Sequence, residues 1–182
     1  THCKPGDQVI LGDQAHIARV EGGGFSRVAG LFPAILPNDV DGGFDPELVR
    51  RTIQSAHRAA PHTALVALEN THNFCGGRVV PQKRIDAIAA TAHEFGIRTH
   101  MDGARIFNAE VASGVPAAEI AKLMDSVTFC LSKGLSCPVG SVICSDVEFI
   151  ERARRNRKFV GGSMRQAGVV AVAGVVALET MI

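Results

Sequence analysis

Lys133 is the residue whose chemical type and position most favour catalysis. It lies two residues after the mostly apolar run 126–131 and precedes a glycine. A lysine at the end of a buried strand can lose its proton by desolvation, and the neutral amine then forms Schiff bases with carbonyl compounds. The alternative interpretation is a solvated lysine on a surface loop.

Asp102 lies at the carboxyl end of a second expected strand, residues 97–101. A carboxylate at that position loses hydration unless it has a cationic partner, and a protonated ring nitrogen of a cofactor would be such a partner. The alternative is a helix N-cap, because Gly103, Ala104 and Arg105 could begin a helical turn. The lysine and the aspartate together are more specific than either residue alone.

Strands and helices alternate along the segments that must position these residues. The expected strands cover residues 9–11, 63–68, 97–101, 126–131 and 139–144. The expected helices cover residues 45–60, 81–95, 116–123 and 148–159, and a last helix, buried in a helix–helix or subunit contact, begins near Gln166. This alternation predicts an α/β fold with a mostly parallel sheet and helices on both faces. Ligands bind such sheets at the carboxyl ends of the strands, where the loop 69–77, Asp102 and Lys133 all fall.

The composition is that of an ordinary globular domain. The 182 residues are 46% hydrophobic and 20% charged, with a net charge of +1. Scattered Lys and Arg residues argue against a nucleic-acid surface, and the basic residues between 152 and 158 are interpreted as the solvated face of a helix. The longest apolar stretch, residues 167–178, is about half of a membrane helix. Five cysteines without a C-x-x-C pair predict reduced thiols and a cytoplasmic protein, and we assign no metal ligands.

Five ordered motifs resemble the low-specificity L-threonine aldolase family of pyridoxal 5'-phosphate (PLP) enzymes. They are Gly-Asp-Gln-Ala-His (12–16) with Glu-Gly-Gly (21–23), Leu-Glu-Asn-Thr-His (68–72), His-Met-Asp-Gly-Ala-Arg-Ile-Phe-Asn-Ala (100–109), Cys-Leu-Ser-Lys-Gly-Leu-Ser-Cys-Pro-Val-Gly-Ser (130–141) and Met-Arg-Gln-Ala-Gly (164–168). The resemblance covers essentially the whole chain. It implies the three-layer large domain of the PLP-dependent transferase fold, as in aspartate aminotransferase.

The resemblance also implies an activity and its partners. The activity is cleavage of L-threonine, L-allo-threonine and related β-hydroxy-α-amino acids to glycine and an aldehyde. The implied partners are this amino acid substrate and further copies of the chain, in a homotetramer or homodimer, without nucleic acid or membrane.

The same resemblance implies which residues hold the cofactor. Lys133 resembles the lysine that forms the Schiff base with PLP, and Asp102 resembles the partner of the pyridine nitrogen. His16 resembles the histidine that stacks on the cofactor ring. Arg165 resembles an arginine that helps to hold the cofactor phosphate, across a subunit interface.

Two further roles concern the substrate. Arg105 resembles the arginine near the cofactor's phenolic oxygen and the substrate carboxylate, for which a planar guanidinium is suited. His72 resembles the second active-site histidine, near the β-hydroxyl of the substrate. His72 is our first choice for the catalytic base and His16 the second, since histidine titrates near working pH. For both, a loop histidine without a catalytic role is the alternative.

Parts of the family pattern are expected to lie outside this chain. A phosphate-binding loop would precede Thr1 and a small domain would follow Ile182, so residues 1–182 are interpreted as a partial PLP-binding large domain. An insertion is expected around residues 32–45. Two alternatives stay open: another PLP enzyme on the same scaffold, such as a β-eliminating lyase or an aminotransferase, and a catalytically inactive fragment.

Overall fold

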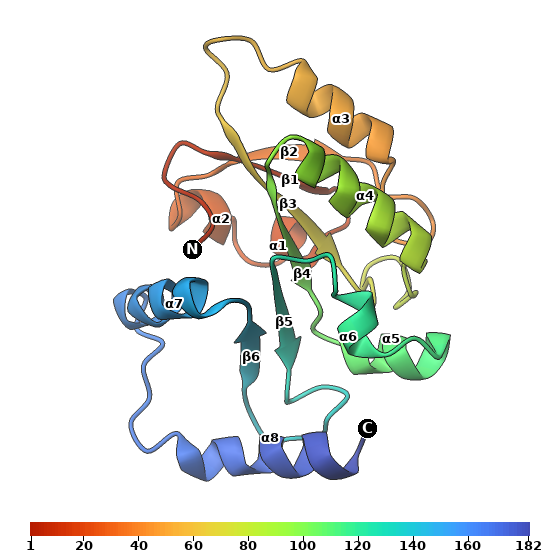
Figure 1. Ribbon diagram of the computed structural model, residues 1–182. Coiled ribbons are helices and arrows are strands. Elements are labelled where there is room, and N and C mark those ends of the chain that lie inside the picture. The colour runs from red at the N-terminus through yellow and green to blue at the C-terminus, as the bar shows by residue number, and fades with distance from the viewer.

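The computed structural model describes residues 1–182 as one six-stranded sheet with helices on both faces (Figure 1). The strands are β1 (Gln8–Gly12), β2 (Phe32–Leu36), β3 (Thr63–Glu69), β4 (Arg98–Asp102), β5 (Ser126–Cys130) and β6 (Ser141–Cys144). Their order across the sheet is β2-β1-β3-β4-β5-β6, and only β6 is antiparallel to its neighbour. The α/β fold with a mostly parallel sheet is therefore confirmed.

Eight helices accompany the sheet. They are α1 (His16–Arg19), α2 (Gly24–Arg27), α3 (Pro46–Gln54), α4 (Gln82–Glu94), α5 (Ile106–Ser113), α6 (Ala117–Ile120), α7 (Val147–Phe159) and α8 (Gly168–Thr180). None of them combines the length and the hydrophobicity that crossing a bilayer requires.

Alternating side chains along β1 explain why both faces of the sheet are covered. Ile10 belongs to a core of 20 buried residues, which includes Val49 of α3 and Ile88 of α4. Its neighbours Val9 and Leu11 belong to a second, smaller core beside α1. Successive side chains of a strand point to opposite faces, so one apolar run supplies both cores.

Helix α3 begins where the sequence predicted but ends earlier. Its start is confirmed, because the Asp45 side chain accepts a hydrogen bond of 2.9 Å from the Glu47 amide. Its expected end near residue 60 is wrong, since the helix stops at Gln54. The next residues form turns, in which His57 Nδ1 accepts a hydrogen bond of 3.1 Å from the Ala59 amide and so competes with helical pairing.

Several short elements were not expected from the sequence. Strand β2, helices α1 and α2, and helix α5 lie in segments without a clear apolar period. Strand β2 occupies the start of the segment 32–45, which was interpreted as an insertion, and it pairs with β1 along all five of its residues.

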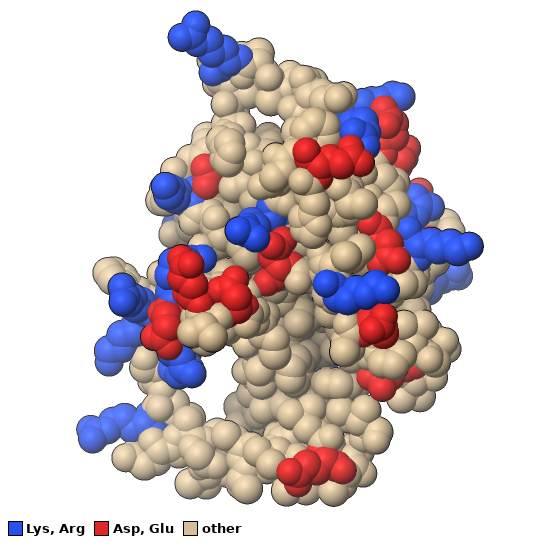
Figure 2. All heavy atoms as spheres, in the orientation of Figure 1, with Lys and Arg blue, Asp and Glu red and all other residues tan.

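Helix α8, which its composition predicts to be buried in a helix–helix or subunit contact, is mostly exposed in the single chain. Only Gly174 and Ala177 are buried, and they lie against the loop after β5. Its valines are largely exposed, and Val169 is 78% exposed. Figure 2 shows charges of both signs intermixed over most of the face drawn, with few at the lower end where α8 lies.

Candidate functional site

Three polar residues form one row across the carboxyl ends of neighbouring strands. Glu69 of β3 is paired in register with Asp102 of β4, which is paired with Thr128 of β5. Paired residues on parallel strands share a face of the sheet. The three side chains line a cavity of about 80 Å³ together with His100. This row is the centre of the candidate site.

The Asp102 carboxylate stabilises the turn after β4. Its Oδ1 accepts a hydrogen bond of 3.0 Å from the Ala104 amide, and the Gly103 amide donates to the Thr128 carbonyl oxygen at 2.8 Å. Because α5 begins only at Ile106, Asp102 does not cap that helix. The carboxylate makes no ion pair with any basic side chain, although it is half buried, so it can still accept a hydrogen bond from a cationic ligand.

Lys133 lies in the turn that follows β5, at the same edge of the sheet. Its side chain is exposed, whereas Leu131 and Leu135 on either side of it are buried and anchor the turn. The adjacent Gly134 lies against α5, since a Cβ there would come within 2.3 Å of Asn108 Oδ1. The turn therefore holds the base of the lysine in a defined place, but the side chain is exposed and not desolvated as the sequence predicted.

His72 is buried beside the row, in the loop that follows β3. Its Nε2 lies 3.9 Å from Glu69 Oε2, and its Nδ1 has no hydrogen-bond partner. Burial lowers the pKa of the His72 imidazole below its usual value, although the nearby Glu69 and Asp102 carboxylates act in the opposite direction. Burial therefore favours the neutral imidazole, whose buried Nδ1 has no hydrogen-bond partner within the chain.

Glu69 joins the loops that carry the two candidate histidines. One carboxylate oxygen accepts a hydrogen bond of 2.7 Å from the His16 amide, and the other accepts one of 2.9 Å from the Asn73 amide. Glu69 is only 7% exposed, and bonds to a buried carboxylate are strong. No role was assigned to Glu69 from the sequence. Its position at the end of a buried strand, like that of Asp102, was the signal that could have found it.

His16 and Arg105 reach the site from two other segments. His16 is the first residue of α1, with Nδ1 3.1 Å from Glu21 Oε1 and its ring centroid 6.5 Å from that of Phe74. Arg105 donates a hydrogen bond of 3.2 Å to Asn73 Oδ1, which ties the turn after β4 to the His72 loop. Both side chains are partly exposed, so a ligand at this edge can reach them.

Arg165 is the candidate that this chain does not bring to the others. It is exposed in the segment between α7 and α8 and makes no hydrogen bond or ion pair with the rest of the candidate residues. A contact of Arg165 with the site would need a further element or another copy of the chain.

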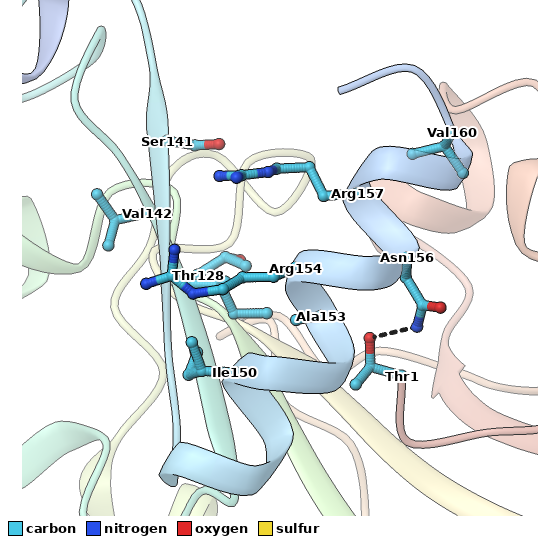
Figure 3. Close-up of a pocket in the computed structure, with 11 residues that line it drawn as sticks. Thr1, Thr128, Ser141, Val142, Ile150, Ala153, Arg154, Asn156, Arg157 and Val160 are labelled. Atoms are coloured by element: carbon cyan, nitrogen blue, oxygen red, sulfur yellow. Dashed lines mark hydrogen bonds between the residues drawn. The ribbon is translucent and has the colours of Figure 1, made fainter. Parts of the chain in front are cut away.

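A larger cavity of about 560 Å³ lies between α7 and strands β5 and β6. Thr128 lines this cavity and the small one beside Asp102, so the two spaces adjoin. Figure 3 shows the Arg154 and Arg157 side chains extending from α7 toward the strands, over Thr128 and Ser141. Both side chains are exposed, as the interpretation of these basic residues as a solvated helix face predicts, and their position over the strands makes them candidates for binding an anion.

The loop before α3 packs directly on His72 through Gly42. Gly42 has a φ of +91°, and a Cβ there would come within 2.4 Å of His72 Cβ. We expect Gly42→Ala to lower the free energy of unfolding by roughly 2–5 kcal/mol, because a positive φ and overpacking both destabilise. Urea denaturation measures this change. Gly76→Ala is the matched control, since Gly76 also has a positive φ, +81°, but nothing within 4 Å; an equal loss in both variants would contradict the contact with His72.

Comparisons with known sequences agree with one another. A family model described as beta-eliminating lyase matches residues 1–182. A probable low-specificity L-threonine aldolase 2 of Arabidopsis thaliana is 46% identical over 181 residues, which are 98% of this chain and 51% of the relative. The low specificity L-threonine aldolase of Escherichia coli (strain K12) is 40% identical over 98% of this chain and 53% of its own length. The chain thus spans about half the length of the curated relatives it matches.

Solved structures share the same architecture. A threonine aldolase of Leishmania major superposes with a TM-score of 0.83 at 21% identity, over 97% of this chain and 52% of that one. A putative L-allo-threonine aldolase of Listeria monocytogenes has a TM-score of 0.80 at 22% identity, over 94% of this chain and 46% of that one. At these identities the likeness concerns the fold.

Proposed function

Since the chain belongs to the beta-eliminating lyase family, with low-specificity L-threonine aldolases among its relatives, we propose that the complete protein is a threonine aldolase. Its substrates would be L-threonine, L-allo-threonine and related β-hydroxy-α-amino acids, and its products glycine and an aldehyde. The family is PLP-dependent, and the fold is that of the large domain of PLP-dependent transferases, in part. The observation that carries the proposal is the grouping of Asp102, His72 and Lys133 at one edge of the sheet.

The side chains at this edge fit PLP chemically. Asp102 is a half-buried carboxylate without a cationic partner, which suits the protonated ring nitrogen. Lys133 is an exposed amine on an anchored turn, which suits covalent attachment of the aldehyde. When bound, PLP supplies a protonated ring that accepts the electron pair left by the broken Cα–Cβ bond.

The chain's own residues would orient the substrate and move the proton. Arg105 would bind the substrate carboxylate, and His16 would stack on the cofactor ring. His72, neutral and with a free Nδ1, would take the proton of the β-hydroxyl as the Cα–Cβ bond breaks and the aldehyde leaves. A proton then returns to Cα to give glycine. Holding the breaking bond perpendicular to the ring is the main contribution of these contacts.

We also propose how the chain assembles and where it acts. Arg165 would bind the cofactor phosphate across a subunit interface. A homotetramer or homodimer would supply that interface. All five cysteines are free, which suits a reducing cytoplasm.

The products formed from L-threonine test the proposed reaction. The full-length protein, loaded with PLP, should release equal amounts of glycine and acetaldehyde. Release of 2-oxobutyrate and ammonia would instead identify a β-eliminating lyase, and transfer of the amino group to a keto acid would identify an aminotransferase. No product at all from the loaded full-length protein would favour an inactive homologue.

The role of His72 as base is tested by His72→Asn. We expect turnover on L-threonine to fall about 10²-fold or more, with little change in PLP affinity, because general-base catalysis is lost while the cofactor contacts remain. His62→Asn is the control, since His62 is exposed and its Nδ1 lies 3.7 Å from Asp7. Steady-state kinetics and PLP titration measure both effects. Unchanged turnover in a folded His72→Asn protein would remove His72 from this role.

A further inference from the structure

Three side chains that the proposed reaction does not use form a hydrogen-bonded chain leading to the Asp102 row. His2 Nε2 lies 2.7 Å from Ser126 Oγ, and Ser126 Oγ lies 2.7 Å from His100 Nδ1. Ser126 is only 2% exposed. The His2 ring packs on Phe149 of α7, with 4.3 Å between ring centroids. Residues from the start of the chain, β4 and β5 are thus joined in one short chain of hydrogen bonds.

The Ser126 hydroxyl links the proton positions of the two imidazoles. It has a single proton, so it donates to one ring and accepts an N–H from the other. If it donates to His100 Nδ1, then His2 must donate through Nε2–H, and His100 carries its own proton on Nε2. If it donates to His2, the proton of His100 lies on Nδ1, and its Nε2 presents a lone pair.

The surroundings of His100 favour the first arrangement. His100 precedes Asp102 by two residues on β4, so the two side chains share a face, and both line the small cavity with Glu69. The negative charges of Glu69 and Asp102 around this cavity favour an N–H over a lone pair on Nε2, the His100 nitrogen that Ser126 does not contact. Burial lowers the pKa of both imidazoles, that of His2 to about 4, which agrees with two neutral rings.

The Coulombic environment of the two rings comes from several segments. Asp102 raises the pKa of His100, in opposition to burial. His100 and Arg98 lower the pKa of His2, and Asp125 raises it. These contributions partly cancel, so burial decides the charge of both rings.

We propose that the His2–Ser126–His100 chain fixes His100 in the Nε2–H tautomer and makes it a positioning residue for Asp102. An N–H held beside the carboxylate would orient it toward the ring nitrogen of PLP. The tautomer rests on the hydrogen bonds alone, whereas the effect on the cofactor rests on the proposed function.

The tautomer is tested first, without reference to activity. Solid-state NMR of the full-length protein labelled with ¹⁵N-histidine distinguishes protonated from unprotonated ring nitrogens, and His2→Gln and His100→Gln assign the signals. We expect both rings to be neutral at pH 7.5 with the proton on Nε2. In Ser126→Ala, His100 should show both tautomers. A charged ring, or His100 protonated on Nδ1, would overturn the proposal.

The effect on the cofactor is tested with a matched pair of variants. His100→Gln places an amide N–H near the position of Nε2, whereas His100→Asn places its polar atoms near Nδ1 and loses the donor beside Asp102. We expect His100→Asn to weaken PLP affinity about tenfold, as loss of a hydrogen bond to a charged group would. His100→Gln should stay close to the wild type.

The visible absorption of bound PLP and its titration measure this difference, and thermal melting confirms folding. Equal affinities in the two folded variants would overturn the positioning role. Failure of the unaltered full-length protein to bind PLP would overturn the proposed function and the role toward Asp102, and would leave the tautomer result standing by itself.

Discussion

Replacing Lys133 by alanine should abolish the visible absorption of bound PLP and lower threonine cleavage by roughly a thousandfold or more, about 4 kcal/mol of transition-state stabilisation. The reason is that this amine is the proposed covalent anchor of the cofactor. The substitution should not disturb folding, because Lys133 is exposed and the buried Leu131 and Leu135 keep the turn in place.

Lys122→Ala is the control for this experiment. Lys122 is an exposed lysine near α6 whose amine pairs only with Glu119, at 3.2 Å, so its loss should leave absorption and turnover unchanged. An ultraviolet–visible spectrum and an acetaldehyde assay on the two full-length variants are sufficient. An undiminished absorption band in Lys133→Ala would exclude Lys133 as the anchor and leave the solvated surface lysine as the interpretation.

Replacing Asp102 by asparagine should separate the two roles that this residue could have. The asparagine oxygen can still accept the hydrogen bond from the Ala104 amide, so the turn after β4 should persist and the free energy of unfolding should change by about 1 kcal/mol or less. The negative charge is lost, so the cofactor ring would no longer be held protonated. We expect turnover to fall about 10²-fold or more, within the range for groups that stabilise charge in a transition state.

Asp102→Ala completes the comparison, because it removes both the charge and the hydrogen bond. It should lose as much activity as Asp102→Asn and in addition about 1–2 kcal/mol of stability. Chemical denaturation and steady-state kinetics on both variants measure the two effects separately. If Asp102→Asn kept full activity and only Asp102→Ala lost stability, Asp102 would be a turn-forming residue and no partner of the cofactor.

The buried carboxylate of Glu69 holds the loops of the candidate site together by hydrogen bonds. Its two oxygens hold the His16 and Asn73 amides, and Asn73 in turn accepts from Arg105. Three segments that are far apart in the sequence are thereby held at one edge of the sheet. Such support from buried hydrogen bonds is what keeps reactive groups in a productive geometry.

Local patterns in the sequence determined much of the fold. A continuous apolar run identified β3, and the periodic Ile85, Ile88 and Ala92 identified α4, because strand and helix periods depend only on neighbouring residues. The same patterns placed Asp102 and Lys133 after strands, where a parallel sheet gathers its ligand contacts. The motifs around these residues also identified the family.

The tertiary structure alone decided which side chains meet. The register of β3 and β4 places Glu69 next to Asp102. Gly42 packs against the buried His72, and Ser126 is hydrogen-bonded to His2, 124 positions away in the chain. Two exposed arginines of α7 extend over the sheet, and most of the apolar α8 remains exposed in the single chain. The physical reason is that local periodicity encodes which face of an element is apolar. Strand register and the packing of distant loops depend on contacts between segments, and no local pattern contains them.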